Sequence, residues 1–463
     1  MTTAPQSGHS AFVLAVSAVA ALGGLLFGYD IGVISGALLF IADDFALTPL
    51  LEGVVTSALL LGAAIGALTG GRLCDRLGRR TTLLIAAGVF VLGALGSGMA
   101  ADTWTLVAAR LVLGLAVGAA SLVVPLYIAE MTPARTRGAL VSLNQLMVTI
   151  GILASYLINS ALAPAEAWRW MLGLAGVPAV LLAVGMLFLP ETPRWFLSKG
   201  REGAARAVLQ RSRPASEVES ELTEISQVLE QERNQDRSLA RLADPSVRPM
   251  LIVGIGLAII QQITGINTII YFAPSILQAT GYGTSGAILS TVGVGVVNVA
   301  LTVVAIFLVD RIGRRPLVLM GIGGMTITAG LLGCVYLLPS LGGAAGYAAL
   351  ILIAAYVAFF AVSLGPVVWL MISEIFPLRI RGTAMSVSTV ALWLTNVLVA
   401  LTFLSMFTAM GPTTTFWIYA LIGTAAWLFT YFLVPETKQR SLEQIESELA
   451  SRAPRARSTP EGA

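Results

Sequence analysis

Charged residues, histidine and cysteine are all scarce in this sequence, and each scarcity narrows what the chain can be. Charged side chains make up only 11% of the 463 residues, well below the share of about a quarter that is usual in soluble domains. The single histidine, His9, lies outside every long apolar run, which excludes a histidine-based proton relay within a membrane. The two cysteines, Cys74 and Cys334, fall in a polar loop and an apolar run, which argues against a disulfide and against a metal site. No pairing of a nucleophile with a base is visible, so we expect no enzyme and no cofactor.

Hydrophobic residues are abundant instead, at 56% of the chain, and they gather in long runs. A run of about 20 apolar residues is long enough to cross a bilayer as a helix. Twelve runs of about that length occur, at residues 11–41, 50–71, 81–101, 104–131, 138–163, 170–189, 249–279, 284–309, 316–339, 345–372, 382–410 and 413–434. The sequence therefore predicts an all-α integral membrane protein with twelve transmembrane helices.

The positions of lysine and arginine predict the orientation of these spans. All 28 of them except Arg110 and Arg169 fall in alternate connections or in the C-terminal tail, and the intervening connections have none. Short loops rich in Lys and Arg stay in the cytoplasm. We therefore expect a multi-pass protein of the cell (plasma) membrane with both termini cytoplasmic. The net charge of +3 follows from this topology and gives no reason to expect nucleic acid as a partner.

Three motifs occur twice, in the same order and at nearly one offset. CDRLGRR at 74–80 returns as VDRIGRR at 309–315, IAEMTPARTRG at 128–138 returns as ISEIFPLRIRG at 372–382, and PET at 190–192 returns at 435–437. A parallel repeat of this kind predicts two six-helix bundles with a substrate site between them. The expected domains are an N-terminal bundle at 1–190, a cytoplasmic linker with amphipathic helices at 191–248, a C-terminal bundle at 249–435 and a cytoplasmic tail at 436–463.

The repeated motifs resemble those of a known superfamily. The doubled D-R-x-G-R-R loop and the doubled E-x-x-P-x-R-x-R-G motif resemble the major facilitator superfamily, and PETPR at 190–194 with PETK at 435–438 resembles its sugar porter family. The resemblance extends from Gly23 to Gln439. It implies the two-bundle fold of that superfamily and transport of a monosaccharide by alternating access.

Glutamates and arginines of the repeated motifs form a candidate cytoplasmic gate. Glu130 and Glu374 end their spans near the negative pole of a helix, which is unfavourable for a carboxylate unless cations lie beside it. By resemblance, such clusters hold the two halves together in the outward-facing state and part in the inward-facing state, and a static staple of loops is the alternative. The candidate gate residues are Arg79, Arg80, Glu130, Arg137, Arg314, Arg315, Glu374 and Arg381.

The linker contains the pattern of an amphipathic helix. Val218, Leu222, Ile225 and Leu229 share one helical face amid glutamates. We expect this helix to pack flat beneath the spans, as resemblance to the intracellular helices of sugar porters implies. A solvated linker helix is the alternative.

A cluster of carboxamides in the seventh span predicts where a sugar would bind. A carboxamide offers an acceptor oxygen and two donors without a charge, which suits adjacent sugar hydroxyls. The segment QQITGIN at 261–267 supplies three carboxamides, and Tyr271 on the same span is a further candidate for sugar binding. Gln262 and Asn267 would not share a face of a straight helix, so we expect a break near Gly265, and transporters place their sites at broken helices.

Other polar and aromatic residues within apolar runs complete the candidate site. By resemblance, sugar contacts fall to Gln145, Gln261, Gln262, Asn267, Asn298, Trp369 and Asn396, with Phe27 and Trp393 as aromatic walls. Hydrogen bonding between helices is the alternative for the amides, and core packing is the alternative for the tryptophans. Leu392 stands where many relatives have an amide, so the resemblance does not identify one sugar. Glycines such as Gly62 and Gly114 predict close contacts between helices.

Asp30 and Arg110 are the two charged residues deep within apolar runs, and such residues mark functional sites. Counted at about 1.5 Å per residue from the outer ends of their spans, they lie at similar depths, about 16 Å and about 9 Å. The arginine would favour the ionised acid and the apolar surroundings the protonated one, so movement of Arg110 can change the proton affinity of Asp30. By resemblance, proton-coupled sugar porters have an acid here and facilitative carriers a neutral amide. A fixed structural salt bridge is the alternative.

Together these residues predict a sugar:proton symporter that imports a monosaccharide, a hexose such as glucose or a pentose such as xylose. The alternatives are a facilitative uniporter, a drug:proton antiporter of the same fold, and a membrane sugar sensor that does not transport. The amide-rich seventh span argues against the antiporter, and no output domain for a sensor is visible. The expected partners are the sugar, protons and the lipid bilayer, and we expect a monomer.

Overall fold

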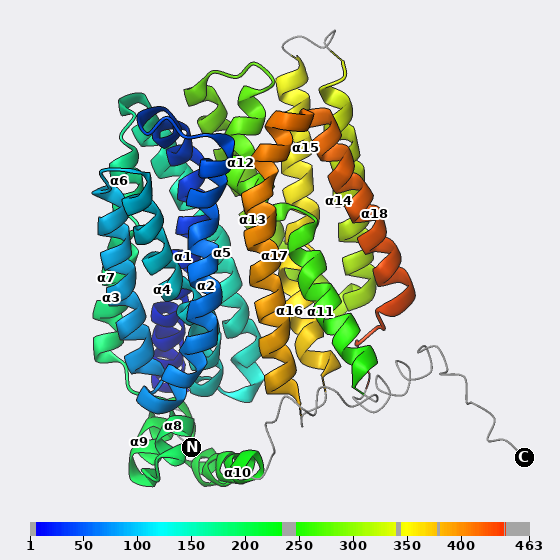
Figure 1. Cartoon of the computed structure of the whole chain (residues 1–463). Coiled ribbons are helices and arrows are strands. Elements are labelled where there is room, and N and C mark those ends of the chain that lie inside the picture. Colours follow the sequence, from blue (N-terminus) through cyan, green and yellow to red (C-terminus); the bar gives the residue numbers. More distant parts are fainter. Residues whose placement is uncertain (1–5, 234–246, 339–343, 377–379, 439, 441–463) are drawn as a thin grey trace, which may run out of the picture.

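The computed structural model describes residues 6–233, 247–338, 344–376, 380–438 and 440, without the side chains of 6–10, 134, 231–233, 310 and 381. Apart from short turns, the described chain is helical (Figure 1). Twelve candidate spans are long and apolar enough to cross a membrane, which confirms the predicted number. The predicted fold class, an all-α membrane protein, is therefore confirmed.

The first six spans form the N-terminal half. Their helices are α1 (Gln6–Asp44), α2 (Pro49–Leu77), α3 (Arg79–Gly98), α4 (Thr103–Met131), α5 (Ala134–Leu162), α6 (Trp168–Gly173) and α7 (Gly176–Phe188). Spans 1 to 5 are each a single helix, whereas span 6 consists of α6 and α7. A short 3₁₀ turn, Ala163–Ala165, links α5 to α6.

Glycines allow the helices of this half to touch backbone to backbone. A Cβ at Gly62 would lie 2.2 Å from the Leu111 carbonyl oxygen, and one at Gly114 would lie 2.1 Å from that of Leu59, so α2 and α4 depend on both glycines. This confirms the predicted close helix contacts. A Cβ at Gly28 would lie 1.8 Å from the Val148 carbonyl oxygen, so α1 approaches α5 in the same way. These contacts hold α1 rigidly in its half.

The last six spans form the C-terminal half. Their helices are α11 (Arg248–Ile263), α12 (Ile266–Gln278), α13 (Thr284–Ile312), α14 (Arg314–Val335), α15 (Ala344–Ala361), α16 (Leu364–Ile375), α17 (Arg381–Met410) and α18 (Pro412–Leu433). Span 7 is broken between α11 and α12, where Gly265 has a φ of 92°. Span 10 is broken between α15 and α16, with no glycine at the break. The first break was predicted and the second was not.

Three short helices lie at one end of the molecule, below the first half in Figure 1: α8 (Pro193–Ser198), α9 (Glu202–Ser212) and α10 (Ala215–Arg233). Helix α10 contains the predicted amphipathic pattern, but its buried Val218 and Leu222 pack with Ala205 and Leu209 of α9 instead of against the spans. Arg213 joins the three helices to the first half, because its guanidinium donates to the carbonyl oxygens of Met131 and Thr132 at 3.0 Å.

The end with α8–α10 also carries the arginine loops at Gly78 and Gly313, and it is called the basic end below. Three helix pairs join the halves: α2 with α17, α5 with α13, and α1 with α12. At the opposite end, Gly53 meets the backbone of Leu401, and Gly295 meets Leu153 on α5. Helix α12 thus touches the first half, whereas α11 packs within its own half on α16, α17 and α18. These two glycine contacts between the halves lie on the side away from α8–α10.

Candidate functional site

Asp30 and Arg110 form an ion pair in the interior of the first half. The Arg110 Nη2 atom lies 3.4 Å from Asp30 Oδ2, and both side chains are 1% exposed. Arg110 Nε donates to the Val55 carbonyl oxygen of α2 at 3.1 Å. The structure therefore joins the two residues that the sequence places at similar depths. It also gives the arginine a second anchor, which sequence reasoning did not identify.

The break in span 7 brings the carboxamides together. Asn267, on α12, donates from Nδ2 to Oε1 of Gln262, on α11, at 2.7 Å. The two residues could not share a face of a straight helix, so the positive φ at Gly265 is what makes this contact possible. The predicted convergence of Gln262 and Asn267 is confirmed.

Gln261 connects the two broken spans. Its Nε2 donates to the Leu364 carbonyl oxygen at 2.9 Å, and Leu364 is the first residue of α16. The Tyr356 hydroxyl of α15 donates to the carbonyl oxygen of Thr264 at the other break. The backbone groups that the breaks release are thus partly satisfied by side chains, as an apolar environment requires. Gln261 Oε1 is buried and has no hydrogen-bond partner among the described residues.

Phe27 and Trp393 form an aromatic contact between the two halves. Their ring centroids lie 5.8 Å apart in an edge-on arrangement, with Phe27 on α1 and Trp393 on α17. Trp393 is 4% exposed, Asn396 is 2% exposed and Asn298 is 5% exposed. Gln145 is half-buried, and Trp369 is 39% exposed on α16. Trp369 is therefore less enclosed than Trp393 and the two asparagines.

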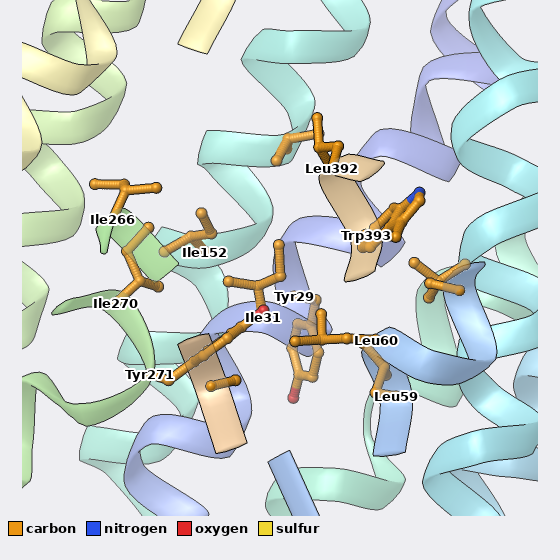
Figure 2. Close-up of a cluster of buried hydrophobic side chains, with 14 of the residues drawn as sticks. Tyr29, Ile31, Leu59, Leu60, Ile152, Ile266, Ile270, Tyr271, Leu392 and Trp393 are labelled. Atoms are coloured by element: carbon orange, nitrogen blue, oxygen red, sulfur yellow. The ribbon is translucent and has the colours of Figure 1, made fainter. Parts of the chain in front are cut away.

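Apolar side chains surround the candidate site where the two halves meet. Figure 2 shows Ile31, Ile152, Ile266 and Ile270 around the point where α1, α5 and α12 meet, with Leu392 beside Trp393. Ile152 and Ile270 lie farther along their helices toward the opposite end than Gln145 and Gln262. Both isoleucines are at most 6% exposed. These two isoleucines therefore lie on the opposite-end side of the amides, whereas Ile266 precedes Asn267 and Leu392 precedes Asn396 along their helices.

At the basic end of the first half, Arg79 pairs with Glu130. The Arg79 Nη2 atom lies 2.9 Å from Glu130 Oε1, and Thr192 donates to Glu130 Oε2 at 2.5 Å. Glu191 accepts the backbone N–H groups of Arg79, Arg80 and Thr192, each at 2.9 Å. This carboxylate therefore caps the N-terminus of α3, where the helix dipole favours an anion. Burial raises the pKa of Glu191 above its usual value, although the N–H groups and Arg79 act in the opposite direction.

The second half repeats this arrangement at the start of α14. Arg314 Nη2 lies 3.4 Å from Glu374 Oε1, and Thr437 donates to Glu374 Oε2 at 2.5 Å. Glu436 accepts the backbone N–H groups of Arg314 and Arg315 at 3.1 and 3.2 Å. Sequence reasoning found the repeated Pro-Glu-Thr motif that contains Glu191 and Glu436, but it gave neither glutamate a role.

The other candidate gate residues do not all reach the carboxylates. The Arg80 side chain donates to the carbonyl oxygens of Met186 and Leu187 at the end of α7, and Arg315 donates to that of Tyr431 on α18. Arg137 is exposed and makes no ion pair that the structure records with Glu130. Arg194 approaches Glu130 instead, at 3.9 Å. The side chain of Arg381 lies outside the described part of the chain.

Comparison with known proteins places this architecture among transporters. The family described as "Sugar (and other) transporter" matches residues 16–449. The chain is 43% identical to the galactose-proton symporter of Escherichia coli (strain K12), over 97% of each chain. It is 44% identical to the glucose transporter GlcP of Staphylococcus epidermidis (strain ATCC 12228 / FDA PCI 1200), over 93% of this chain and 96% of that one. The xylose transporter XylE from E. coli, in a partially occluded inward-open conformation, matches with a TM-score of 0.83 and 34% identity, over 93% of this chain and all of that one.

Proposed function

The chain belongs to the sugar transporter family of the major facilitator superfamily, and from this premise we propose that it is a sugar:proton symporter that imports a monosaccharide by alternating access. It is a membrane transporter and not an enzyme. We place it in the plasma membrane with the basic end in the cytoplasm, because that end carries the Lys- and Arg-rich loops.

The observation that carries the proposal is the fully buried ion pair between Asp30 and Arg110. Ionised groups are expensive in the membrane interior, and one that persists there points to ion or substrate coupling. When Asp30 takes up a proton the attraction to Arg110 falls, and when the proton leaves the attraction returns. The pair can therefore exist in two charge states, as proton coupling requires.

Neutral amides supply the sugar site in this proposal. Gln262 and Asn267 bond to each other, so a sugar hydroxyl that accepts from Asn267 Nδ2 and donates to Gln262 Oε1 can insert between them and leave both amides satisfied. Gln261 and Asn396 each have a buried oxygen without a hydrogen-bond partner among the described residues. Gln145, Asn298 and Trp369 would complete the contacts, while Phe27 and Trp393 would pack on the apolar faces of the ring.

Alternating access follows from the way the halves meet. The halves touch toward the opposite end through Gly53 and Leu401, and the buried Ile152 and Ile270 lie on that side of the amides. At the basic end, the ion pairs that the structure records for Glu130 and Glu374 join each carboxylate to an arginine of its own half or, for Arg194, of the linker helix α8. We propose that this is the inward-facing state and that these carboxylates gain partners across the halves when the basic end closes. The likeness to an inward-open structure supports this reading.

A facilitative uniporter is the second candidate, because Arg110 is held by Val55 as well as by Asp30, as a static bridge would be. Uptake of a panel of radiolabelled hexoses and pentoses into proteoliposomes, with and without an imposed proton gradient, distinguishes the two. Accumulation above the external concentration only with the gradient is the expected result. Equilibration alone under both conditions would establish the uniporter. Uptake of no sugar in the panel would refute both.

A further inference from the structure

Three buried polar atoms without partners gather where the two halves meet. They are Nη1 of Arg110, the hydroxyl of Tyr271 and Oδ1 of Asn396, and none has a hydrogen-bond partner within the described part of the chain. The three residues are at most 2% exposed. A buried polar group without a partner is costly, so such a cluster marks a place where partners change.

Tyr271 is the member of this cluster that reaches from the sugar-binding helix to the ion pair. It lies on α12, four residues after Asn267, and in Figure 2 its hydroxyl points at α1 beside Ile31. It lies close enough to Asp30 and Arg110 to be affected by both charges, and it lies beside Asn396 without a hydrogen bond of ordinary geometry. Helix α12 packs directly on α1, whereas α11 does not belong to that contact.

The surroundings of Asp30 leave few groups that could respond to its proton. Arg110 on α4 is the charged group that acts on Asp30 among the described residues. Tyr29, its neighbour on α1, donates its hydroxyl away from the pair, to the Met171 carbonyl oxygen at 3.1 Å. On α17 the nearby Asn396 is neutral, and the Val55 carbonyl on α2 is occupied by Arg110. Helices α5, α6, α7 and α9 also pack on α1, but Arg169 of α6 pairs with Asp44 and Arg211 of α9 lies over Phe12, each far along α1 from Asp30.

We propose that Tyr271 is a positioning residue that couples sugar at α12 to the proton on Asp30. A hydroxyl can donate to the ionised carboxylate and accept from the protonated one, directly or through a water molecule. Because Tyr271 shares α12 with Asn267, a shift of that helix on sugar binding changes how well its hydroxyl reaches Asp30. The inference rests on the proposed symport and adds the residue through which the two substrates communicate.

The test is Tyr271→Phe, measured by sugar counterflow and by proton-driven accumulation across a range of pH. Hydrogen bonds to an ionised group are the stronger ones, so loss of the hydroxyl favours protonated Asp30. The pH of half-maximal transport should therefore move upward by about half a unit or more. The ratio of accumulation to counterflow should also fall. Thermal stability in detergent should not fall, because the lost hydroxyl has no partner within the described structure.

Tyr336→Phe is the matched control. Its hydroxyl also supports α12, by donating to the Ile276 carbonyl oxygen at 2.7 Å, but Tyr336 is the C-cap residue of α14 in the second half. This variant should lose stability without moving the pH profile. An unchanged pH profile and ratio in Tyr271→Phe, with accumulation intact in the wild type, would overturn this proposal alone. Absence of proton-driven accumulation in the wild type would overturn the symport proposal and this one with it.

Discussion

The two halves of this protein share one device at the basic end and differ in their interiors. In each half an arginine pairs with the glutamate that ends a span, while a second glutamate caps the helix that begins at that arginine. Inside, the first half has the buried pair of Asp30 and Arg110 on unbroken α1 and α4. The second half has broken spans with carboxamides at the breaks instead.

The difference shows how a duplicated bundle can divide two tasks. A charge within the membrane is tolerated when rigid, fully bonded helices surround it, and the glycine contacts of α1 provide that rigidity. A neutral polyol needs many donors and acceptors, and broken helices place both side chains and released backbone groups at one point. We therefore propose that the first half couples the proton and that the second half makes most of the sugar contacts.

The largest expected effect is that of Asp30→Asn, which tests whether the first half couples the proton. The amide resembles the carboxylate in shape but cannot bind and release a proton, so accumulation driven by a proton gradient should fall to the level of equilibration. Counterflow of sugar should survive, because the amides of the second half are untouched. Asp43→Asn, on the exposed end of the same helix, should accumulate sugar normally. Accumulation by Asp30→Asn at the wild-type level would remove coupling from this residue.

Substitution of the carboxamides tests the second half. Gln262→Ala and Asn267→Ala should each weaken sugar binding by about 1 to 3 kcal/mol, because a sugar hydroxyl or the remaining amide loses its partner in a dry site. The proton dependence of the residual transport should persist. Gln278→Ala removes a carboxamide from the end of the same helix, where it bonds to Thr284, and should leave affinity unchanged. Calorimetric titration of folded protein measures all three, and unaltered affinity in the first two would place the site elsewhere.

Substitution of one glycine in each half compares how the backbone of the two halves is stabilised. Gly28→Ala would force α1 away from α5, and Gly265→Ala would place a side chain at a φ of 92° against Tyr419. Each should lower the free energy of unfolding by about 1 to 3 kcal/mol, the first through overpacking and the second mainly through backbone strain. Gly88→Ala on α3, where a Cβ meets nothing, should be neutral or slightly stabilising. Melting temperatures measured in one detergent should be lower for Gly28→Ala and Gly265→Ala than for Gly88→Ala. Equal values for all three variants would contradict this expectation.

The smallest expected effect is that of Arg137→Ala, at the candidate cytoplasmic gate. Arg137→Ala should change stability in the inward-facing state by less than about 0.5 kcal/mol, because this arginine is exposed and makes no ion pair that the structure records. Arg79→Ala should cost about 3 kcal/mol or more, since it leaves the buried Glu130 carboxylate without its nearest cation. A melting temperature that falls as far for Arg137→Ala as for Arg79→Ala would show that Arg137 already belongs to the Glu130 cluster.

Much of the fold was predictable because the bilayer imposes strong rules on sequence. Span number follows from runs of about 20 apolar residues, and the break at Gly265 follows from a glycine between carboxamides. The break before α16 was missed although Gly365 and Pro366 follow it, and Pro366 has no N–H to donate to the Val362 carbonyl oxygen. The packing of α10 was missed for another reason. An amphipathic face identifies a buried side but not the partner that covers it, and α9 supplies that partner.

The candidate site was likewise predictable in part from the sequence. Residue types and depths in the sequence were sufficient to single out Asp30, Arg110, Gln262 and Asn267, because polar groups in apolar runs are few and expensive. Only the tertiary structure decided that Arg110 is also held by Val55, that Glu130 takes Arg79 and Arg194 while Arg137 stays exposed, and that Tyr271 points at α1. These outcomes depend on how helices from distant parts of the chain rotate and approach one another, and hydropathy and motif spacing do not encode that geometry.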